Sequence, residues 1–450
     1  MRIRIRRAAL ALTVGLLALS RQLSGDVGDV RDVERALRSE MEAKRIRGAA
    51  VAVVHGDSVV FATGIGDSDP ESLLPVRAET FFRIGSTTKV FVATAALLLA
   101  HEGRLDLDRP VSDYVAGLAP KVGLLTMNQL LTHTAGLFDD APMAGPGDDG
   151  ALGREVLSWT DESVFLPPGR FHSYSNPGYW LVGHVIETVA KEPFADAMER
   201  LVLRPLGMAR STFRPEAAAR LPLAAPFDGR RREIVPAPNH AGTLPSGSLY
   251  SSAREMARLP IALMNGGRLE GRQVLPEEVV TSLLTPRVDV PERPGSRYGY
   301  GLLFETRRGV KRVFHTGGRA GYGSILRMAP DEKFAVIVLA NRTAAVMSRT
   351  ADAATSVFVA QGPVSPEPPS KPFRDGSVPF EGTFECPKPL KLKLYTLGVL
   401  QMKHGFMRAP LKRREDGLFT DSVLVLAVTR GADGRVDYLH TELHTLARVK

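Results

Sequence analysis

The feature that most constrains the fold is a nearly continuous run of small and apolar residues from Val90 to Ala100. The run is long enough for a helix, and it offers no polar face to solvent. A helix of this kind must be covered by other elements on all sides. It follows directly on Ser86-Thr87-Thr88-Lys89, whose hydroxyl groups can cap free N–H groups at a helix start. The sequence therefore predicts a buried central helix that begins at a polar segment.

Strand patterns occur on both sides of a helical middle. Apolar residues recur at helical spacing over 28–46, and a β-hairpin is expected at 49–54 and 58–62. Residues 105–290 are rich in helices and loops. Later segments predict four strands and a helix, at 300–305, 311–315, 323–328, 334–339 and 344–360. A sheet built from both ends of the chain and flanked by helices is an α+β arrangement, not a parallel βαβ series.

Composition divides the chain into four regions. Residues 1–20 combine a basic start, an apolar run and a small-x-small site at Ala18-Leu19-Ser20, as in a cleaved export signal. The apolar run is short for a membrane anchor. Residues 21–361 form the α+β domain, and residues 362–377 contain five prolines, which predicts a linker. Residues 378–450 predict a small β domain. We expect a periplasmic or secreted protein.

The charge of the chain indicates no nucleic-acid partner. The formal net charge of +9 falls to +5 without the four arginines of the leader, leaving 54 basic against 49 acidic residues. Residues 388–450 hold 12 basic and 6 acidic residues, so the end domain can contact an anionic cell envelope, although a solvated surface explains this excess as well. Cys386 is the sole cysteine, which excludes an intramolecular disulfide and a cysteine-based metal site.

Ser86 and Lys89 are three residues apart, and positions with this spacing share one face of a helix. A serine is a weak nucleophile until a base takes its proton. A lysine can act as that base when burial or a nearby positive charge keeps it neutral. The alternative is structural, with Ser86 as a helix cap and Lys89 as an ordinary residue of the first turn.

Two further segments carry side chains suited to acyl transfer. In Tyr174-Ser175-Asn176, a tyrosine can shuttle a proton if neighbouring cations lower its pKa, and an asparagine can bind both a lysine and a substrate carbonyl. In His315-Thr316-Gly317-Gly318, a strand end can offer a backbone N–H to an oxyanion, and glycines allow substrate to approach. Taken singly, each segment is explained as well by a loop or a β-turn.

Together, and in this order along the chain, the three segments resemble the motifs of the serine β-lactamase and penicillin-binding protein superfamily. The chain is most similar to the class C-like branch, which includes DD-peptidases, D-amino-acid peptidases and carboxylesterases. Further stretches support the resemblance over residues 28–360, namely 102–108, 130–137, 298–302 and 321–324.

The resemblance implies a role for each motif residue. Ser86 would be the acylated nucleophile, Lys89 its activating partner and Tyr174 an assistant in proton transfer. Asn176 would contact substrate and orient Lys89. The segment from His315 through Thr316 and Gly317 would line the substrate site, and the N–H groups of Ser86 and Gly318 would form the oxyanion hole.

The chain departs from many β-lactamases and DD-peptidases at His315, where those proteins have lysine. Histidine is mostly neutral at pH 7, so it holds a substrate carboxylate less well than lysine does. Arg319 would restore the positive charge if it faces the substrate, and it has no such role if it is a solvent-facing loop residue. The departure itself resembles the D-aminopeptidase-like and esterase-like members.

The sequence thus predicts a secreted serine hydrolase that forms an acyl-enzyme on an ester, amide or β-lactam carbonyl of a small molecule or peptide. Activity should fall in acid as Lys89 and His315 become protonated. The acyl-transfer mechanism implies no metal or organic cofactor; the histidines show no zinc-ligand spacing, and no phosphate-binding glycine loop occurs. The alternative is a non-enzymatic penicillin-sensing or envelope-binding module on the same fold.

Overall fold

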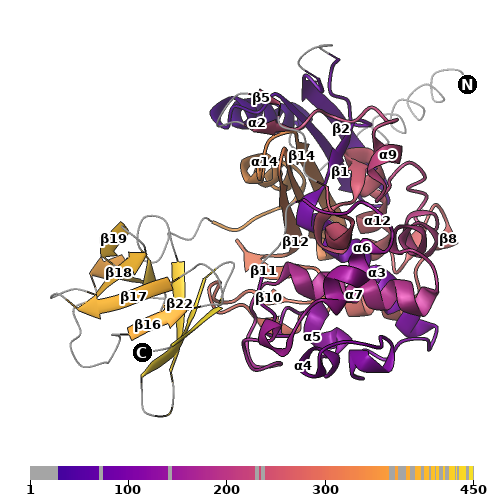
Figure 1. Ribbon diagram of the computed structural model, residues 1–450. Helices are drawn as coiled ribbons and strands as arrows, with labels where there is room; N and C mark the ends of the chain where they lie inside the picture. The colour runs from indigo at the N-terminus through magenta and orange to yellow at the C-terminus, as the bar shows by residue number, and fades with distance from the viewer. Residues whose placement is uncertain are drawn as a thin grey trace, which may run out of the picture.

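The computed structural model shows a large α+β body and a smaller all-β body (Figure 1). In the first body it describes residues 29–69, 74–139, 144–228, 233–234 and 239–363. In the second it describes residues 370–372, 382–385, 391–396, 400–404, 407–410, 412–414, 419–420, 425–430, 432, 435–441 and 445–448. The predicted export signal, Cys386 and most of the predicted linker lie outside the described residues.

An antiparallel sheet of eight strands forms the centre of the large body, in the order β2-β1-β14-β13-β12-β11-β10-β9. β1 pairs with both β2 and β14, so strands from the two ends of the domain lie side by side (Figure 1). This confirms the predicted fold class. The strands are β1 (Gly48–His55), β2 (Ser58–Gly66), β9 (Val288–Asp289), β10 (Arg297–Tyr298), β11 (Leu303–Arg307), β12 (Val310–Arg319), β13 (Tyr322–Ala329) and β14 (Phe334–Ala340).

One predicted strand is wrong in its bounds. The predicted strand at 300–305 begins too early, because the chain bends at 299–302, where the Gly299 N–H donates to the Leu302 carbonyl, and β11 begins only at Leu303. β11 pairs with the short strand β10, which lies before the bend and outside the predicted segment. β12 is longer than predicted and runs through the whole segment from His315 to Arg319, so this segment is not a β-turn.

Helices cover both faces of the sheet. On one face, α2 (Val30–Ala43) packs against α14 (Ser348–Phe358) and buries Val33 and Leu37 against β1 and β14. The Glu40 carboxylate of α2 accepts hydrogen bonds of 2.8 Å from the backbone N–H and the hydroxyl of Thr350. This carboxylate therefore joins the two helices, although they are distant in sequence.

The helical middle of the chain covers the other face, and α3 (Thr88–His101) is its central element (Figure 1). The neighbouring α7 (Asn176–Ala190) packs against α3. The remaining helices of this region are α4 (Pro120–Gly123), α5 (Met127–Leu131), α6 (Ala151–Leu157), α8 (Phe194–Met198), α9 (Pro215–Ala218), α10 (Leu244–Gly247), α11 (Ala253–Met256), α12 (Arg258–Met264) and α13 (Glu277–Leu283). Short strand pairs join β3 (Phe81–Arg83) to β6 (Tyr250–Ser252), β4 (Phe227–Asp228) to β5 (Glu233–Ile234) and β7 (Arg268–Leu269) to β8 (Arg272–Gln273).

The start of α3 differs from the sequence-based expectation. A 3₁₀ turn (η1, Gly85–Thr87) precedes the helix, and Thr87 makes no side-chain capping bond. The Thr87 hydroxyl instead bonds to the Ser324 hydroxyl of β13 at 2.7 Å. These hydroxyl groups therefore join the central helix to the sheet rather than cap the helix.

The smaller body is a second antiparallel sheet, formed by β15 (Ser370–Pro372), β16 (Gly382–Glu385), β17 (Lys391–Thr396), β18 (Leu400–His404), β19 (Met407–Pro410), β20 (Lys412–Arg414), β21 (Phe419–Thr420), β22 (Val425–Arg430), β23 (Val436–His440) and β24 (Thr445–Arg448). β15 lies within the predicted linker, yet it pairs with β20, so that part of the linker belongs to the sheet.

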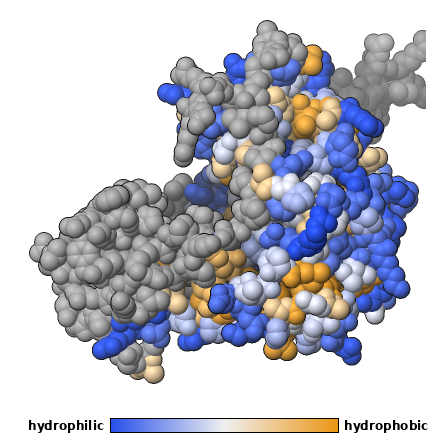
Figure 2. Space-filling view, in the orientation of Figure 1, coloured by the Kyte–Doolittle hydropathy of each residue, from blue (hydrophilic) through white to orange (hydrophobic). Residues whose placement is uncertain are grey.

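The coloured part of the surface in Figure 2 is largely hydrophilic, with a few separate hydrophobic areas. Among the described residues, we find no helix with the length and apolar character needed to cross a bilayer.

Candidate active site

Ser86 lies in the 3₁₀ turn between β3 and α3, pressed against β12. Gly85 makes this approach possible, because it has a positive φ of 55° and a Cβ at this position would lie 2.7 Å from the backbone N of Gly318. Gly317 is equally constrained, since a Cβ there would meet the Ile84 carbonyl oxygen at 2.1 Å. Glycine at both positions therefore lets the turn and the strand bring Ser86 and Gly318 into one pocket.

Lys89 is fully buried, and its ammonium group has three acceptors. Its Nζ donates to Ser86 Oγ at 3.2 Å, to Asn176 Oδ1 at 2.8 Å and to the Ser246 carbonyl at 2.8 Å. Burial lowers the pKa of Lys89 to about 7; the Arg319 charge lowers it as well, while the Asp139 charge opposes the shift. A large fraction of Lys89 is therefore neutral at physiological pH, as a base for Ser86 must be.

Tyr174 lies beside the same two residues. Its hydroxyl lies near enough to Ser86 for that side chain to affect the pKa of Tyr174, and its ring centroid is 4.8 Å from Lys89 Nζ. The expectation that neighbouring cations lower its pKa is wrong, because burial dominates and raises the pKa of Tyr174 well above its usual value. Tyr174 therefore keeps its proton at neutral pH, so of the two side chains Lys89 is the one that can accept a proton from Ser86.

Asn176 is held by a carboxylate that sequence analysis missed. Asn176 is the first residue of α7, after the N-cap Ser175, and its Nδ2 donates to the two oxygens of Asp139 at 3.0 and 3.3 Å. This fixes the amide so that its oxygen faces Lys89. Asp139 lies two residues after the family-like stretch 130–137, and an acid at that place was the one signal in the sequence that could have identified it.

His315 belongs to a chain of hydrogen bonds that fixes its tautomer. Its Nδ1 lies 2.6 Å from the Thr316 carbonyl, so Nδ1 carries the proton, and its Nε2 accepts from the Tyr298 hydroxyl at 3.2 Å. Tyr298 is bonded in turn to His133 Nε2 at 3.2 Å, and His133 Nδ1 accepts from the Ser175 N–H at 3.1 Å. Because His133 Nδ1 accepts a hydrogen bond, that ring is neutral, and the chain is complete with a neutral His315 as well.

Burial explains why both rings are neutral. It lowers the pKa of His315 to about 3 and the pKa of His133 well below its usual value, and the nearby charge of Lys89 contributes to both shifts. The expectation that His315 gains a proton as activity falls in mild acid is therefore wrong. His315 supplies no positive charge to a substrate above pH 3 or so.

Arg319 is the last residue of β12 and lines the pocket, half-buried, rather than lying on a solvent-facing loop. Its Nη2 donates to the Thr243 hydroxyl at 2.9 Å. Burial lowers the pKa of Arg319 to about 10, so the side chain is still charged at pH 7. Arg319 thus brings a cation to the site at which His315 brings none.

Most of the predicted residues share one pocket of about 640 Å³, a volume typical of small-molecule sites, although Gly317 does not line it. Ser86, Tyr174, Asn176, His315, Thr316, Gly318 and Arg319 all line it, and Lys89 lies behind them. Sequence analysis missed several further lining residues: Asp139, His172, Glu292, Arg293 and Tyr298. Within the described residues, no group of three or more His, Cys, Asp or Glu side chains is arranged to hold a metal ion.

The small β body touches the loop that precedes Tyr174. The Phe171 ring lies 4.6 Å from Tyr438 and 5.3 Å from His440, both in β23. The Arg170 guanidinium lies 5.3 Å from the centre of the Tyr438 ring. The second sheet therefore packs against the polypeptide that carries Tyr174 and Asn176.

Lys89 also gives a prediction about pH. If neutral Lys89 takes the Ser86 proton, kcat/KM should fall roughly tenfold per pH unit below a midpoint near pH 7 and level off above it. The Asp139 charge raises the pKa of Lys89 and the Arg319 charge lowers it. Asp139→Asn should therefore shift the midpoint to lower pH and Arg319→Gln to higher pH, as seen in pH–rate profiles. Shifts of the same sign in both variants would contradict this electrostatic account.

Comparison with known proteins agrees with the geometry. The Beta-lactamase family model matches residues 33–361. Penicillin-binding protein 4 of Amycolatopsis lactamdurans is 29% identical over 78% of this chain and 95% of its own length. The unguisins hydrolase of Aspergillus violaceofuscus is 27% identical over 69% of this chain, which spans 61% of that protein.

Solved structures resemble the chain over different extents. The structure of SurE with D-Leu covers 94% of this chain and all of its own, with a TM-score of 0.74 and 24% identity. The class C beta lactamase from Rhodobacter sphaeroides covers 73% of this chain and 98% of its own, with a TM-score of 0.61 and 24% identity. The likeness to these two structures shows the fold alone. The fold, the match over residues 33–361 and the arrangement of Ser86, Lys89 and Tyr174 lead to one conclusion: the chain belongs to the beta-lactamase family of the serine β-lactamase and penicillin-binding protein superfamily.

Proposed function

We propose that the chain is an exported serine hydrolase that works through an acyl-enzyme on Ser86. The observation that carries the proposal is the buried Lys89, whose Nζ lies 3.2 Å from Ser86 Oγ and whose pKa is lowered to about 7. Burying a lysine without an ionic partner costs free energy. A purely structural role therefore does not explain why Lys89 is buried beside Ser86.

The reaction follows from these positions. Neutral Lys89 takes the Ser86 proton while Oγ attacks the substrate carbonyl carbon, and the oxyanion is stabilised by the N–H groups of Ser86 and Gly318. Tyr174, which keeps its proton, passes one to the leaving group and is reprotonated from Lys89. Water then attacks the acyl carbonyl, loses its proton to the same base, and releases Ser86.

The pocket favours carboxylesterase or D-amino-acid peptidase activity over efficient β-lactam hydrolysis. The neutral His315 cannot supply the charge with which many β-lactamases hold the substrate carboxylate. Arg319 offers a cation at the end of the same strand, so a carboxylate-bearing substrate remains compatible with the site.

The first test is the intact mass of the mature protein and of Ser86→Ala after incubation with a penicillin, followed by panels of esters and D-amino-acid amides. We expect turnover of one of these classes by the wild type and none by Ser86→Ala, whose fold should be intact. Full activity in Ser86→Ala would refute the proposal. A lasting adduct on Ser86 with no turnover of any class would instead favour a penicillin-sensing module.

Export gives a separate prediction. The leader composition of residues 1–20 supports cleavage after Ser20. N-terminal sequencing of the protein recovered from outside the cytoplasm of a bacterial host should therefore begin at Arg21. An unprocessed Met1 in protein recovered only from the cytoplasm would contradict export.

A further inference from the structure

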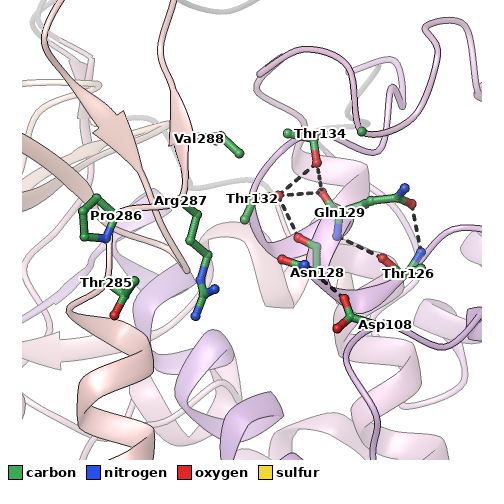
Figure 3. Close-up of a pocket in the computed structure, with 11 residues that line it drawn as sticks. Asp108, Thr126, Asn128, Gln129, Thr132, Thr134, Thr285, Pro286, Arg287 and Val288 are labelled. Atoms are coloured by element: carbon green, nitrogen blue, oxygen red, sulfur yellow. Dashed lines mark hydrogen bonds between the residues drawn. The ribbon is translucent and has the colours of Figure 1, made fainter.

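A second cavity of about 650 Å³ lies apart from the catalytic pocket (Figure 3). One wall is formed by α5 and its flanks, and the facing wall by the segment 285–288 that follows α13. In Figure 3 the Arg287 side chain stands across open space from Asn128 and Asp108. The volume is in the range of small-molecule sites.

The two cavities lie on opposite sides of the same two chain segments, 132–134 and 287–292, whose residues face one cavity or the other. Thr132 and Thr134 line the second cavity, while His133 between them has a φ of 57° and turns its ring into the hydrogen-bonded chain of the catalytic site. Further along the chain, Arg287 lines the second cavity and Glu292 the catalytic pocket.

Hydrogen bonds within the protein fix the side chains of the wall at α5. Thr126 and Gln129 form a capping box, and the Asn128 amide donates to Asp108 at 3.1 Å and accepts from the Tyr300 hydroxyl at 3.1 Å. Gln129 uses its amide oxygen in the box, so its Nε2 can donate into the cavity. Asp108 likewise keeps an oxygen that Asn128 does not occupy.

The facing wall carries one cation. The Arg287 guanidinium lies 3.8 Å from the centre of the Tyr300 ring, and within the described part of the chain it makes one hydrogen bond, a long one of 3.5 Å to the Ser282 carbonyl. Its Nε has no hydrogen-bond partner among the described residues. Stacking on Tyr300 holds the planar group in place without neutralising it, so its outer N–H groups remain available to a carboxylate.

We propose that this second cavity binds a small zwitterion of the amino-acid or dipeptide class, with its carboxylate on Arg287 and its ammonium group on Asp108. The lining has one positive and one negative side chain. A phosphate or other dianion would be repelled by Asp108, and a simple cation by Arg287. Gln129 and the threonine hydroxyls add hydrogen bonds to the body of the ligand. The proposal does not depend on the reaction at Ser86.

The test is calorimetric titration of the full-length Ser86→Ala protein with the dipeptide Ala-Ala, which that variant should not turn over. We expect saturable binding, with a Kd at least about tenfold higher for the N-acetylated and for the C-amidated dipeptide, since each loses a charge-assisted contact. Adding Arg287→Gln should weaken Ala-Ala binding by a similar factor. Adding Asp108→Asn should remove the preference for the free over the acetylated dipeptide.

Arg109→Gln is the matched control, because Arg109 is an exposed cation beside Asp108 that does not line the cavity; its Kd should be unchanged. Three results would overturn the proposal: no saturable binding up to about 10 mM, which is weaker than any useful site; equal binding in the Arg287→Gln protein; or equally tight binding of an uncharged sugar. Cooperative thermal melting checks that each variant is folded, and the two blocked dipeptides test the charges without any substitution in the cavity.

Discussion

Replacing Lys89 by methionine should lower kcat/KM by roughly 10³- to 10⁴-fold on whichever ester or amide the protein turns over, because general-base catalysis contributes up to this amount. Methionine fills similar space in a site where Lys89 is fully buried. The Ser86 hydroxyl would remain in place but would lose the group that takes its proton. Steady-state kinetics measures the loss, and the rate of acyl-enzyme formation shows whether acylation is the step affected.

Lys89→Arg separates the proton-transfer role from the charge. Arginine keeps the positive charge next to Ser86 and Asn176 but does not lose its proton in proteins. If Lys89 acts as a base, Lys89→Arg should be as inactive as Lys89→Met. Substantial activity in Lys89→Arg would mean that Lys89 works as a fixed cation, and the mechanism proposed above would then be wrong. Cooperative melting of both variants excludes loss of fold as the cause.

The sequence predicted the fold well, because the signals were long and regular. The apolar run at Val90–Ala100 implied a buried helix, and α3 occupies that place. Strand patterns at the two ends implied a shared sheet, and β1 pairs with β14. The errors lie in local detail, such as the bend at 299–302, which occupies the start of the strand predicted at 300–305. Bends of this kind depend on tertiary packing and leave little trace in hydrophobic periodicity.

The sequence predicted which residues form the candidate site better than it predicted their protonation states. The motifs placed Ser86, Lys89, Tyr174, Asn176 and His315 in one site, and the structure brings them together. The protonation of Tyr174 and His315 was not predictable, because it depends on burial by distant segments. Asp139 was missed for a similar reason, since an acid in a loop shows its role only when its partner Asn176 is known.

Gly85 and Gly317 lie where the turn that carries Ser86 contacts β12, and the sequence at these two positions determines how closely the two segments approach. Each marks a point at which backbone contacts backbone, and neither contributes a side chain to the chemistry. Gly85 is the more informative of the two. It combines a left-handed φ of 55° with a Cβ position only 2.7 Å from the Gly318 backbone N, one of the two proposed oxyanion donors.

Gly85→Ala should therefore reduce kcat by about 10²- to 10³-fold, the cost of disturbing one oxyanion donor. The added methyl group must push the turn away from β12, which separates the N–H groups of Ser86 and Gly318. Gly309→Ala is the matched control, because Gly309 also has a positive φ, 78°, but has nothing within 4 Å of the added Cβ. Both variants should lose about 1–2 kcal/mol of unfolding free energy from the left-handed backbone, whereas only Gly85→Ala should lose activity. Equal kcat values in the two variants, measured alongside their thermal or denaturant unfolding, would show that the contact between the turn and β12 does not position the oxyanion hole.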